Sequence, residues 1–150
     1  MPPRFAIAAM LLALSGSAAA APPPPPAWTG SRGLFCAALD RALAAAREPT
    51  PFASLRIDMI GDADRSRMDM PGFDRCHVWG DELRCSVSQA PPELTLENLT
   101  ADTVRCLGVQ PRDDEGFQVF DLEGAMIQVE SECSDECQAG RIVNYRVGSR

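Results

Sequence analysis

The sequence predicts an α+β domain in which two helices pack on a mostly antiparallel sheet of about six strands, stapled by disulfides. Three observations support this fold class. Apolar residues recur at helical spacing and then at alternating spacing, and this change occurs twice along the chain. Glycine-containing turns separate the alternating segments. All six cysteines lie between residues 36 and 137, after the N-terminal apolar segment of the chain. The predicted element order is α-β-β-β-α-β-β-β.

The first twenty residues have the pattern of a secretory signal peptide. Arg4 is followed by an apolar stretch over residues 5–14 and by small residues that end in Ala18-Ala19-Ala20. A membrane span needs about 20 apolar residues, so this stretch is too short to be one. We expect residues 1–20 to be a cleaved signal peptide, with neither a membrane span nor a lipid anchor.

Residues 21–30 form a proline-rich spacer, because residues 22–26 are five consecutive prolines. Such a run favours extended polyproline II; its alternative role is as a ligand for a proline-binding module. Residues 31–150 are then a single disulfide-stabilised domain, which is long enough to enclose one hydrophobic core.

The domain begins with a helix over residues 33–47, in which Phe35, Leu39 and Leu43 share one face. Two prolines at 49 and 51 end it. A strand follows, with Leu55, Ile57 and Met59 alternating with charged residues. Residues 61–72 are polar and charged, so we expect a loop there.

Residues 75–85 predict a β-hairpin with Gly80-Asp81 as its two-residue turn. This register places Cys76 opposite Cys85 on a non-hydrogen-bonded pair, where the Cα atoms come close enough for a disulfide. The same alternation puts the cysteines on the core face. It puts His77, Trp79 and Arg84 on the opposite face.

The second half begins with a helix that ends at Leu107 before Gly108. Thr100 is the expected N-cap, although Leu96 fits either a longer helix or a strand. A hairpin follows, in which residues 117–122 and 125–131 flank a turn at 123–124 and Phe120 faces Ile127. The last strand covers residues 142–147; if Val143 pairs with Ile127, Cys133 falls opposite Cys137.

An even number of cysteines in an exported chain predicts a disulfide framework. A zinc site is not expected, because the chain has no C-x-x-C pair and one histidine. The expected bonds are Cys76–Cys85, Cys133–Cys137 and, by elimination, Cys36–Cys106. These bonds place the protein in the periplasm or among secreted proteins.

The residues favour a non-enzymatic protein, with no cofactor. The one histidine lies beside Arg84 on the outer face of the predicted hairpin, a poor position for a general base. Arginines interrupt the aspartates of the 61–72 loop, so a calcium loop is not expected. The acidic residues that favour a hydrolase instead are Glu130, Glu132, Asp135 and Glu136.

We therefore expect an exported protein-binding module, such as an inhibitor, an accessory subunit or an envelope factor. Its expected contacts with another envelope or extracellular protein are Trp79, Met68 and Met70. The alternatives are a small carboxylate-dependent hydrolase and a periplasmic copper carrier, in which Met68, Met70 and His77 are the soft ligands. The net charge of −7 disfavours binding to nucleic acid and mildly favours a basic partner.

Overall fold

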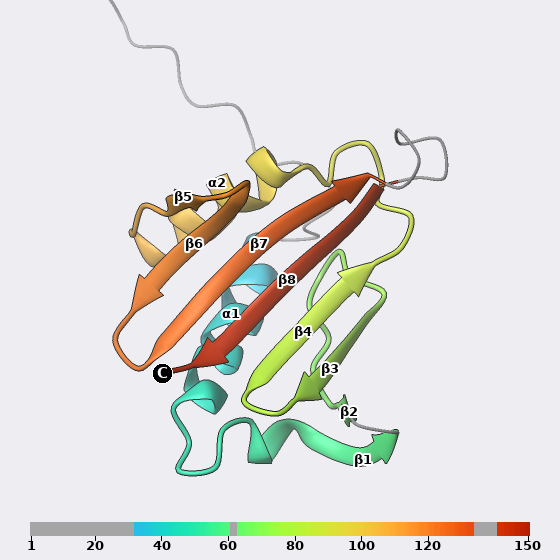
Figure 1. Ribbon diagram of the computed structural model, residues 1–150, viewed down its shortest axis with the longest axis vertical. Helices are drawn as coiled ribbons and strands as arrows, with labels where there is room; N and C mark the ends of the chain where they lie inside the picture. The colour runs from blue at the N-terminus through green and yellow to red at the C-terminus, as the bar shows by residue number, and fades with distance from the viewer. Residues whose placement is uncertain (1–31, 61–62, 134–140) are drawn as a thin grey trace, which may run out of the picture.

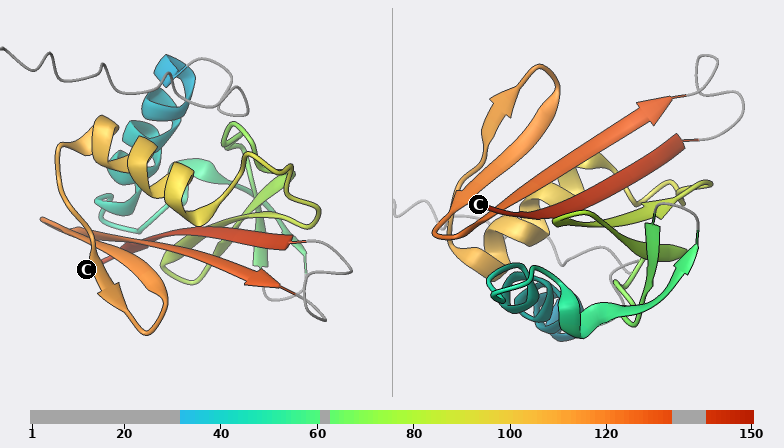
Figure 2. Two further views of the ribbon diagram at one scale, coloured as in Figure 1. Left: turned by 90° about the horizontal axis from the view of Figure 1, so that it is seen from above. Right: turned by 60° about the horizontal axis from the view of Figure 1, so that its bottom comes forward.

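The structure, a computed structural model, describes residues 32–60, 63–133 and 141–150. In these residues two helices lie on one side of an eight-stranded antiparallel sheet (Figures 1 and 2). The elements are α1 (Arg32–Ala46), the 3₁₀ turn η2 (Ala53–Leu55), β1 (Arg56–Ile60), β2 (Ala63–Ser66), β3 (Arg75–Trp79), β4 (Glu82–Val87), α2 (Leu96–Leu107), β5 (Arg112–Asp114), β6 (Phe117–Leu122), β7 (Ala125–Cys133) and β8 (Arg141–Ser149). The predicted signal peptide and spacer lie outside the described residues.

The α+β class is confirmed, but the sheet is larger than the six strands predicted. The two additional strands are β2, within the expected loop, and β5, which the sequence did not indicate. The β5 sequence is Arg-Asp-Asp, and all three residues are exposed. Because β5 is an edge strand whose side chains are all polar and exposed, it has no apolar alternation to reveal it. The order of strands across the sheet is β1-β2-β3-β4-β8-β7-β6-β5.

This order divides the chain into two halves of similar topology. In each half a helix is followed by four strands, and the last strands, β4 and β8, pair with each other at the centre. The predicted unit of one helix and three strands is thus one of a helix and four strands. The centre is apolar on its core side, where Leu83 pairs with Val147.

The β3–β4 hairpin has the predicted register. Cys76 pairs with Cys85, His77 with Arg84 and Trp79 with Glu82. Gly80 has a φ of 60°, a left-handed conformation that glycine adopts with little cost. The Cys76–Cys85 disulfide joins the two strands with a Cα–Cα distance of 4.0 Å.

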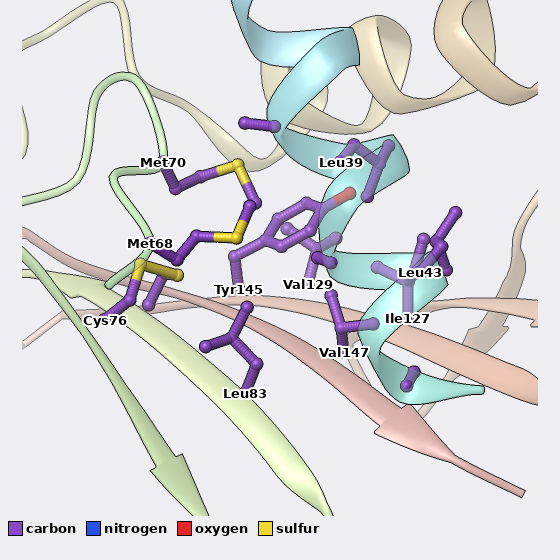
Figure 3. Packing of buried hydrophobic residues seen from close by; sticks show 14 of the residues in the cluster. Leu39, Leu43, Met68, Met70, Cys76, Leu83, Ile127, Val129, Tyr145 and Val147 are labelled. Carbon is purple, nitrogen blue, oxygen red and sulfur yellow. A yellow bond between two sulfur atoms is a disulfide. The ribbon is translucent and has the colours of Figure 1, made fainter. Parts of the chain in front are cut away.

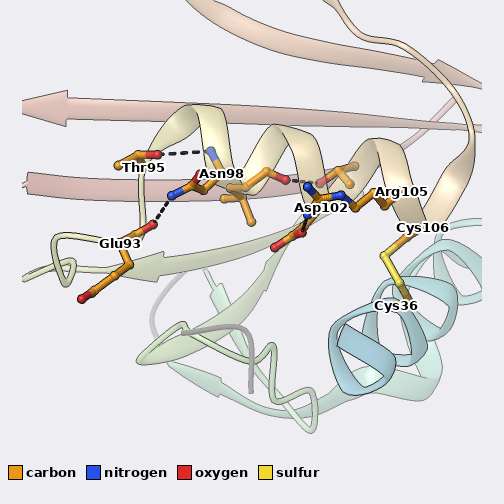
Figure 4. A network of polar contacts seen from close by, with 9 residues as sticks. Cys36, Glu93, Thr95, Asn98, Asp102, Arg105 and Cys106 are labelled. Atoms are coloured by element: carbon orange, nitrogen blue, oxygen red, sulfur yellow. Dashed lines mark hydrogen bonds and ion pairs between the residues drawn. A yellow bond between two sulfur atoms is a disulfide. The ribbon is translucent and has the colours of Figure 1, made fainter. Parts of the chain in front are cut away.

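Helix α2 begins earlier than at Thr100, so that residue is not the N-cap. Thr95 caps the helix, since its Oγ1 accepts a hydrogen bond from the Asn98 backbone N–H at 3.1 Å (Figure 4). At the other end Gly108 has a φ of 69° and donates its N–H to the carbonyl of Val104. The Cys36–Cys106 disulfide joins α2 to α1, as the elimination argument predicts.

The register of β7 and β8 differs from the predicted one. Ile127 pairs with Val147 instead of Val143, and Cys133 pairs with Arg141. A shift of four residues keeps the same side chains on the core face, so periodicity alone could not choose between the two registers. The expected Cys133–Cys137 bond depended on the shorter register. Cys137 itself lies outside the described residues.

The core lies between the helices and the sheet, and Tyr145 is fully buried within it (Figure 3). The rings of Phe35 and Phe73 contact the Tyr145 ring edge-on, with centroids 5.9 Å away in both cases. Met68 and Met70 are each 2% exposed and point into the same cluster. The expectation that these methionines contact a partner is therefore wrong, because they fill the space between the sheet and α1.

The strand predicted at Leu55, Ile57 and Met59 is also irregular. Leu55 is buried within η2, whereas Ile57 is 42% exposed in β1. A shift in register between Arg56 and Met59 breaks the alternation between these residues.

Candidate partner-binding face

The candidate partner-binding residues lie on the face of the sheet opposite the helices. We call this face the outer face. Along β3 the side chains of Arg75, His77 and Trp79 lie on this face, while those of Cys76 and Val78 enter the core. In both views of Figure 2 the two helices lie on the other side of the sheet. None of the described helices covers the outer face.

Trp79 and Arg84 form a pair on the outer face. Trp79 is 47% exposed, and the Arg84 guanidinium carbon lies 5.4 Å from the centroid of its ring. The Arg84 Nε also donates a hydrogen bond to Glu82 at 2.8 Å. Glu82 and the indole thus hold the arginine in one position, and a large part of the indole stays open to solvent.

His77 is surrounded by arginines from three strands. The register places Arg65 of β2 on one side of His77 and Arg84 of β4 on the other. Arg75 lies two residues earlier on β3 and so points to the same face. The guanidinium groups of Arg65 and Arg75 make no hydrogen bond or ion pair with a described residue, and both side chains are exposed.

A cavity of about 430 Å³ opens beside this cluster, and we call it the His77 cavity. Its lining includes Arg65, Ser66, Asp69, Asp74, Arg75 and His77. The His77 Nδ1 atom is buried and has no hydrogen-bond partner among the described residues. Asp74 already accepts hydrogen bonds from the backbone N–H and the hydroxyl of Ser88.

Further along the outer face, Glu130 is buried and fully engaged. Its Oε1 accepts hydrogen bonds from Arg146 at 2.6 Å and from Asn144 at 2.8 Å. A carboxylate held by two donors serves as the acceptor of a structural ion pair. Of the other acidic residues considered for a hydrolase, Glu132 is exposed and Asp135 and Glu136 lie outside the described residues. Of these four acidic residues, Glu130 is therefore already engaged in a structural ion pair with Arg146.

A second hollow, of about 530 Å³, lies between α2 and the β5–β6 hairpin. Leu96, Val104 and Pro111 give it an apolar lining, and the Thr100 hydroxyl there is buried without a hydrogen-bond partner among residues 32–60, 63–133 and 141–150. Its polar rim includes both Glu97 and Arg105, so charge does not indicate an occupant.

Of the residues considered for copper, Met68 and His77 both line the His77 cavity, whereas Met70 does not. His77 lies on the outer face, while Met68 and Met70 are buried on the core side. In the described part of the chain, no three histidine, cysteine or acidic residues come close enough to hold a metal ion.

The sequence predicted part of this site. The alternation in residues 75–85 placed Trp79, His77 and Arg84 together on the outer face, where the structure also has them. Sequence reasoning missed Arg65, because the segment was interpreted as a loop and β2 has no apolar alternation. The β2 sequence, Ala-Asp-Arg-Ser, has no alternation that would distinguish a strand from a loop.

Comparisons with protein families, with curated proteins and with solved structures found no match to this chain. Among the described helices, none is both long and apolar enough to cross a membrane.

Proposed function

We propose that the protein is an exported binding module that uses its outer face to recognise an acidic segment of another envelope or extracellular protein. The observation that carries this proposal is the half-exposed Trp79 beside Arg84 on the side of the sheet away from the helices. Tryptophan and arginine are the residues most enriched at the energetic centres of protein interfaces. The two disulfides support a location in an oxidising compartment.

The charge of the partner follows from the arginine cluster. Although the chain carries a net charge of −7, Arg65 and Arg75 project from the outer face without an acidic partner among the described residues. Complementary charge steers association and selects among partners. The local surface thus favours an acidic partner, in contrast to the basic partner that the total charge suggests.

The proposal is tested by capture from envelope extract on the immobilised protein. Trp79→Ala should weaken binding of the captured protein at least about 30-fold, since truncating a central tryptophan typically costs about 2 kcal/mol or more. Raising the salt concentration should weaken the wild-type interaction as well, because exposed charges are screened. Leu34→Ala is the matched control, because Leu34 is 61% exposed on α1 in the helical layer.

Thermal unfolding of each variant separates binding from folding. We expect Trp79→Ala to keep the melting temperature of the wild type within a few degrees, since the side chain is 47% exposed and does not belong to the buried core cluster. Capture that is equal for the two variants and insensitive to salt would contradict the proposal. Unfolding of Trp79→Ala would show that the indole belongs to the core.

A further inference from the structure

The His77 cavity combines three features that a binding site for an oxyanion requires. It has concave shape, with a volume of about 430 Å³. It has cationic donors, because Arg65 and Arg75 line it and neither guanidinium is engaged by a described residue. It also includes His77, whose Nδ1 is buried without a hydrogen-bond partner in the described part of the chain.

Arginines in adjacent strands repel each other unless an acid compensates them. Glu82 compensates Arg84, which flanks His77 on β4. Arg65, which flanks it on β2, has no such acid among the described residues. Arg75, which also lines the cavity, has no ion pair with an acid among the described residues either. Neither guanidinium is hydrogen-bonded or paired with an acid among the described residues, so both can donate to an anion that lies between them.

Asp69 and Asp74 also line the cavity, so the formal charge of its lining is balanced, but neither aspartate forms an ion pair with Arg65 or Arg75. Asp74 is held by Ser88 at the start of β3, where it organises the backbone. Asp69 is exposed in the segment between β2 and β3 and has no ion pair with a described residue. An anion would therefore approach the arginines with two carboxylates near it, so we expect modest affinity for a single small anion.

We infer that the His77 cavity binds an oxyanion through the guanidinium groups of Arg65 and Arg75. Planar guanidinium groups donate paired hydrogen bonds that match a carboxylate or a phosphate. On the function proposed above, the natural occupant is an aspartate or glutamate side chain of the partner. Trp79 lies two residues beyond His77 on β3, and strand residues two apart share a face. Trp79 would then contact the same acidic segment.

The test is a titration of the full mature protein followed by nuclear magnetic resonance. The chain has one histidine, so the imidazole signals report on His77 alone. The probes are sodium acetate and sodium phosphate, and sodium chloride is the control. All three titrations are made at the same pH and at matched ionic strength. We expect acetate and phosphate to give saturable shifts of the His77 ring and of the Arg65 and Arg75 amides, and chloride to give none that saturate.

Arg75→Gln and Arg65→Gln should each weaken acetate binding at least about tenfold. Arg41→Gln is the matched control, because Arg41 is exposed on α1 and its loss changes the net charge equally. Shifts that do not saturate, or that remain in both cavity variants, would overturn the inference. Saturation by phosphate without acetate would overturn the carboxylate assignment.

The outcomes also separate the inference from the proposed function. If acetate saturates the cavity while capture on the outer face does not depend on Trp79, the cavity remains and the proposed function fails. If capture depends on Trp79 while neither anion saturates the cavity, the proposed function remains and the inference fails.

Discussion

Tyr145 is the residue whose environment is most unusual. Its phenol is fully buried and shares a hydrogen bond of 3.0 Å with the Thr103 hydroxyl, which also donates to the Leu99 carbonyl. Burial raises the pKa of the Tyr145 phenol far above its ordinary value, and the hydrogen bond to Thr103 offsets only part of this effect. The folded protein therefore holds Tyr145 in its neutral form.

This environment predicts a specific loss of stability at high pH. The unfolded phenol ionises near pH 10, whereas the folded one stays protonated above that pH, so the free energy of unfolding should fall as pH rises above about 10. The chain has one tyrosine and no lysine, which makes Tyr145 the main side chain to titrate there. Phenolate absorbance of the native protein should appear only together with unfolding.

Tyr145→Phe is the matched variant for this measurement. We expect it to lose about 1 kcal/mol of stability at neutral pH, since Thr103 keeps its bond to Leu99. Above pH 10 the free energy of unfolding of the variant should decline less steeply than that of the wild type. Phenolate absorbance in a protein that remains folded at pH 11 would contradict the assignment.

At the scale of elements, the segments with a strong alternating pattern were the predictable ones. The β3–β4 hairpin could be predicted to the residue, because a Gly-Asp turn and two facing cysteines agree on one register. Strands β2 and β5 could not, since their sequences, Ala-Asp-Arg-Ser and Arg-Asp-Asp, have no alternation of apolar and polar residues. The prediction of the arginine cluster is incomplete for the same reason. It places Arg84 correctly on the outer face, but it does not include Arg65, which belongs to β2.

The methionines show a second limit of sequence reasoning. Met68 and Met70 alternate with charged residues between two strands, a pattern that fits an exposed loop as well as it fits a buried one. The segment folds back so that Arg67 donates its N–H to the Leu55 carbonyl, and both methionines then reach the core beside Tyr145. That long-range contact has no local signal.

The two disulfides join different kinds of elements, and we expect them to differ in response to a reductant. Cys36 and Cys106 are partly exposed where α1 meets α2, whereas Cys76 and Cys85 are 5% and 1% exposed. A mild thiol reductant should therefore reduce Cys36–Cys106 first, because thiolate attack needs access to the sulfur. Alkylation followed by peptide mapping gives the order directly.

Loss of the Cys36–Cys106 disulfide should also lower the free energy of unfolding. It closes a separation of 70 residues, against 9 for the hairpin bond. In the chain-entropy description these loops correspond to about 4–5 and about 2–3 kcal/mol. Cys36→Ala combined with Cys106→Ala should thus lower the free energy of unfolding by about 4 kcal/mol in urea titration. A loss below about 1 kcal/mol would show that the helices are held by packing alone.

At the scale of the whole molecule, the two halves are interlocked. The helix of the first half, α1, packs against β8 of the second half as well as against β4 of its own. The pairing of β4 with β8 makes one continuous sheet, and the Cys36–Cys106 bond joins the helices. The outer face crosses the same boundary, since Arg84 of β4 lies opposite Arg146 of β8. Neither half can therefore bury its apolar side chains alone.

This architecture predicts that the described domain unfolds as one cooperative unit. Leu83 is fully buried in β4 and pairs with Val147 of β8, so Leu83→Ala should remove about 2–5 kcal/mol from the global stability. Native-state hydrogen exchange should show that loss equally in the slowest amides of β3, β4, β7 and β8, because all of them exchange through global unfolding. Glu82→Ala is the control at the exposed end of the same strand and should change these amides by less than about 1 kcal/mol. A loss confined to β3 and β4, with β7 and β8 still fully protected, would mean that the second half is stable without the first.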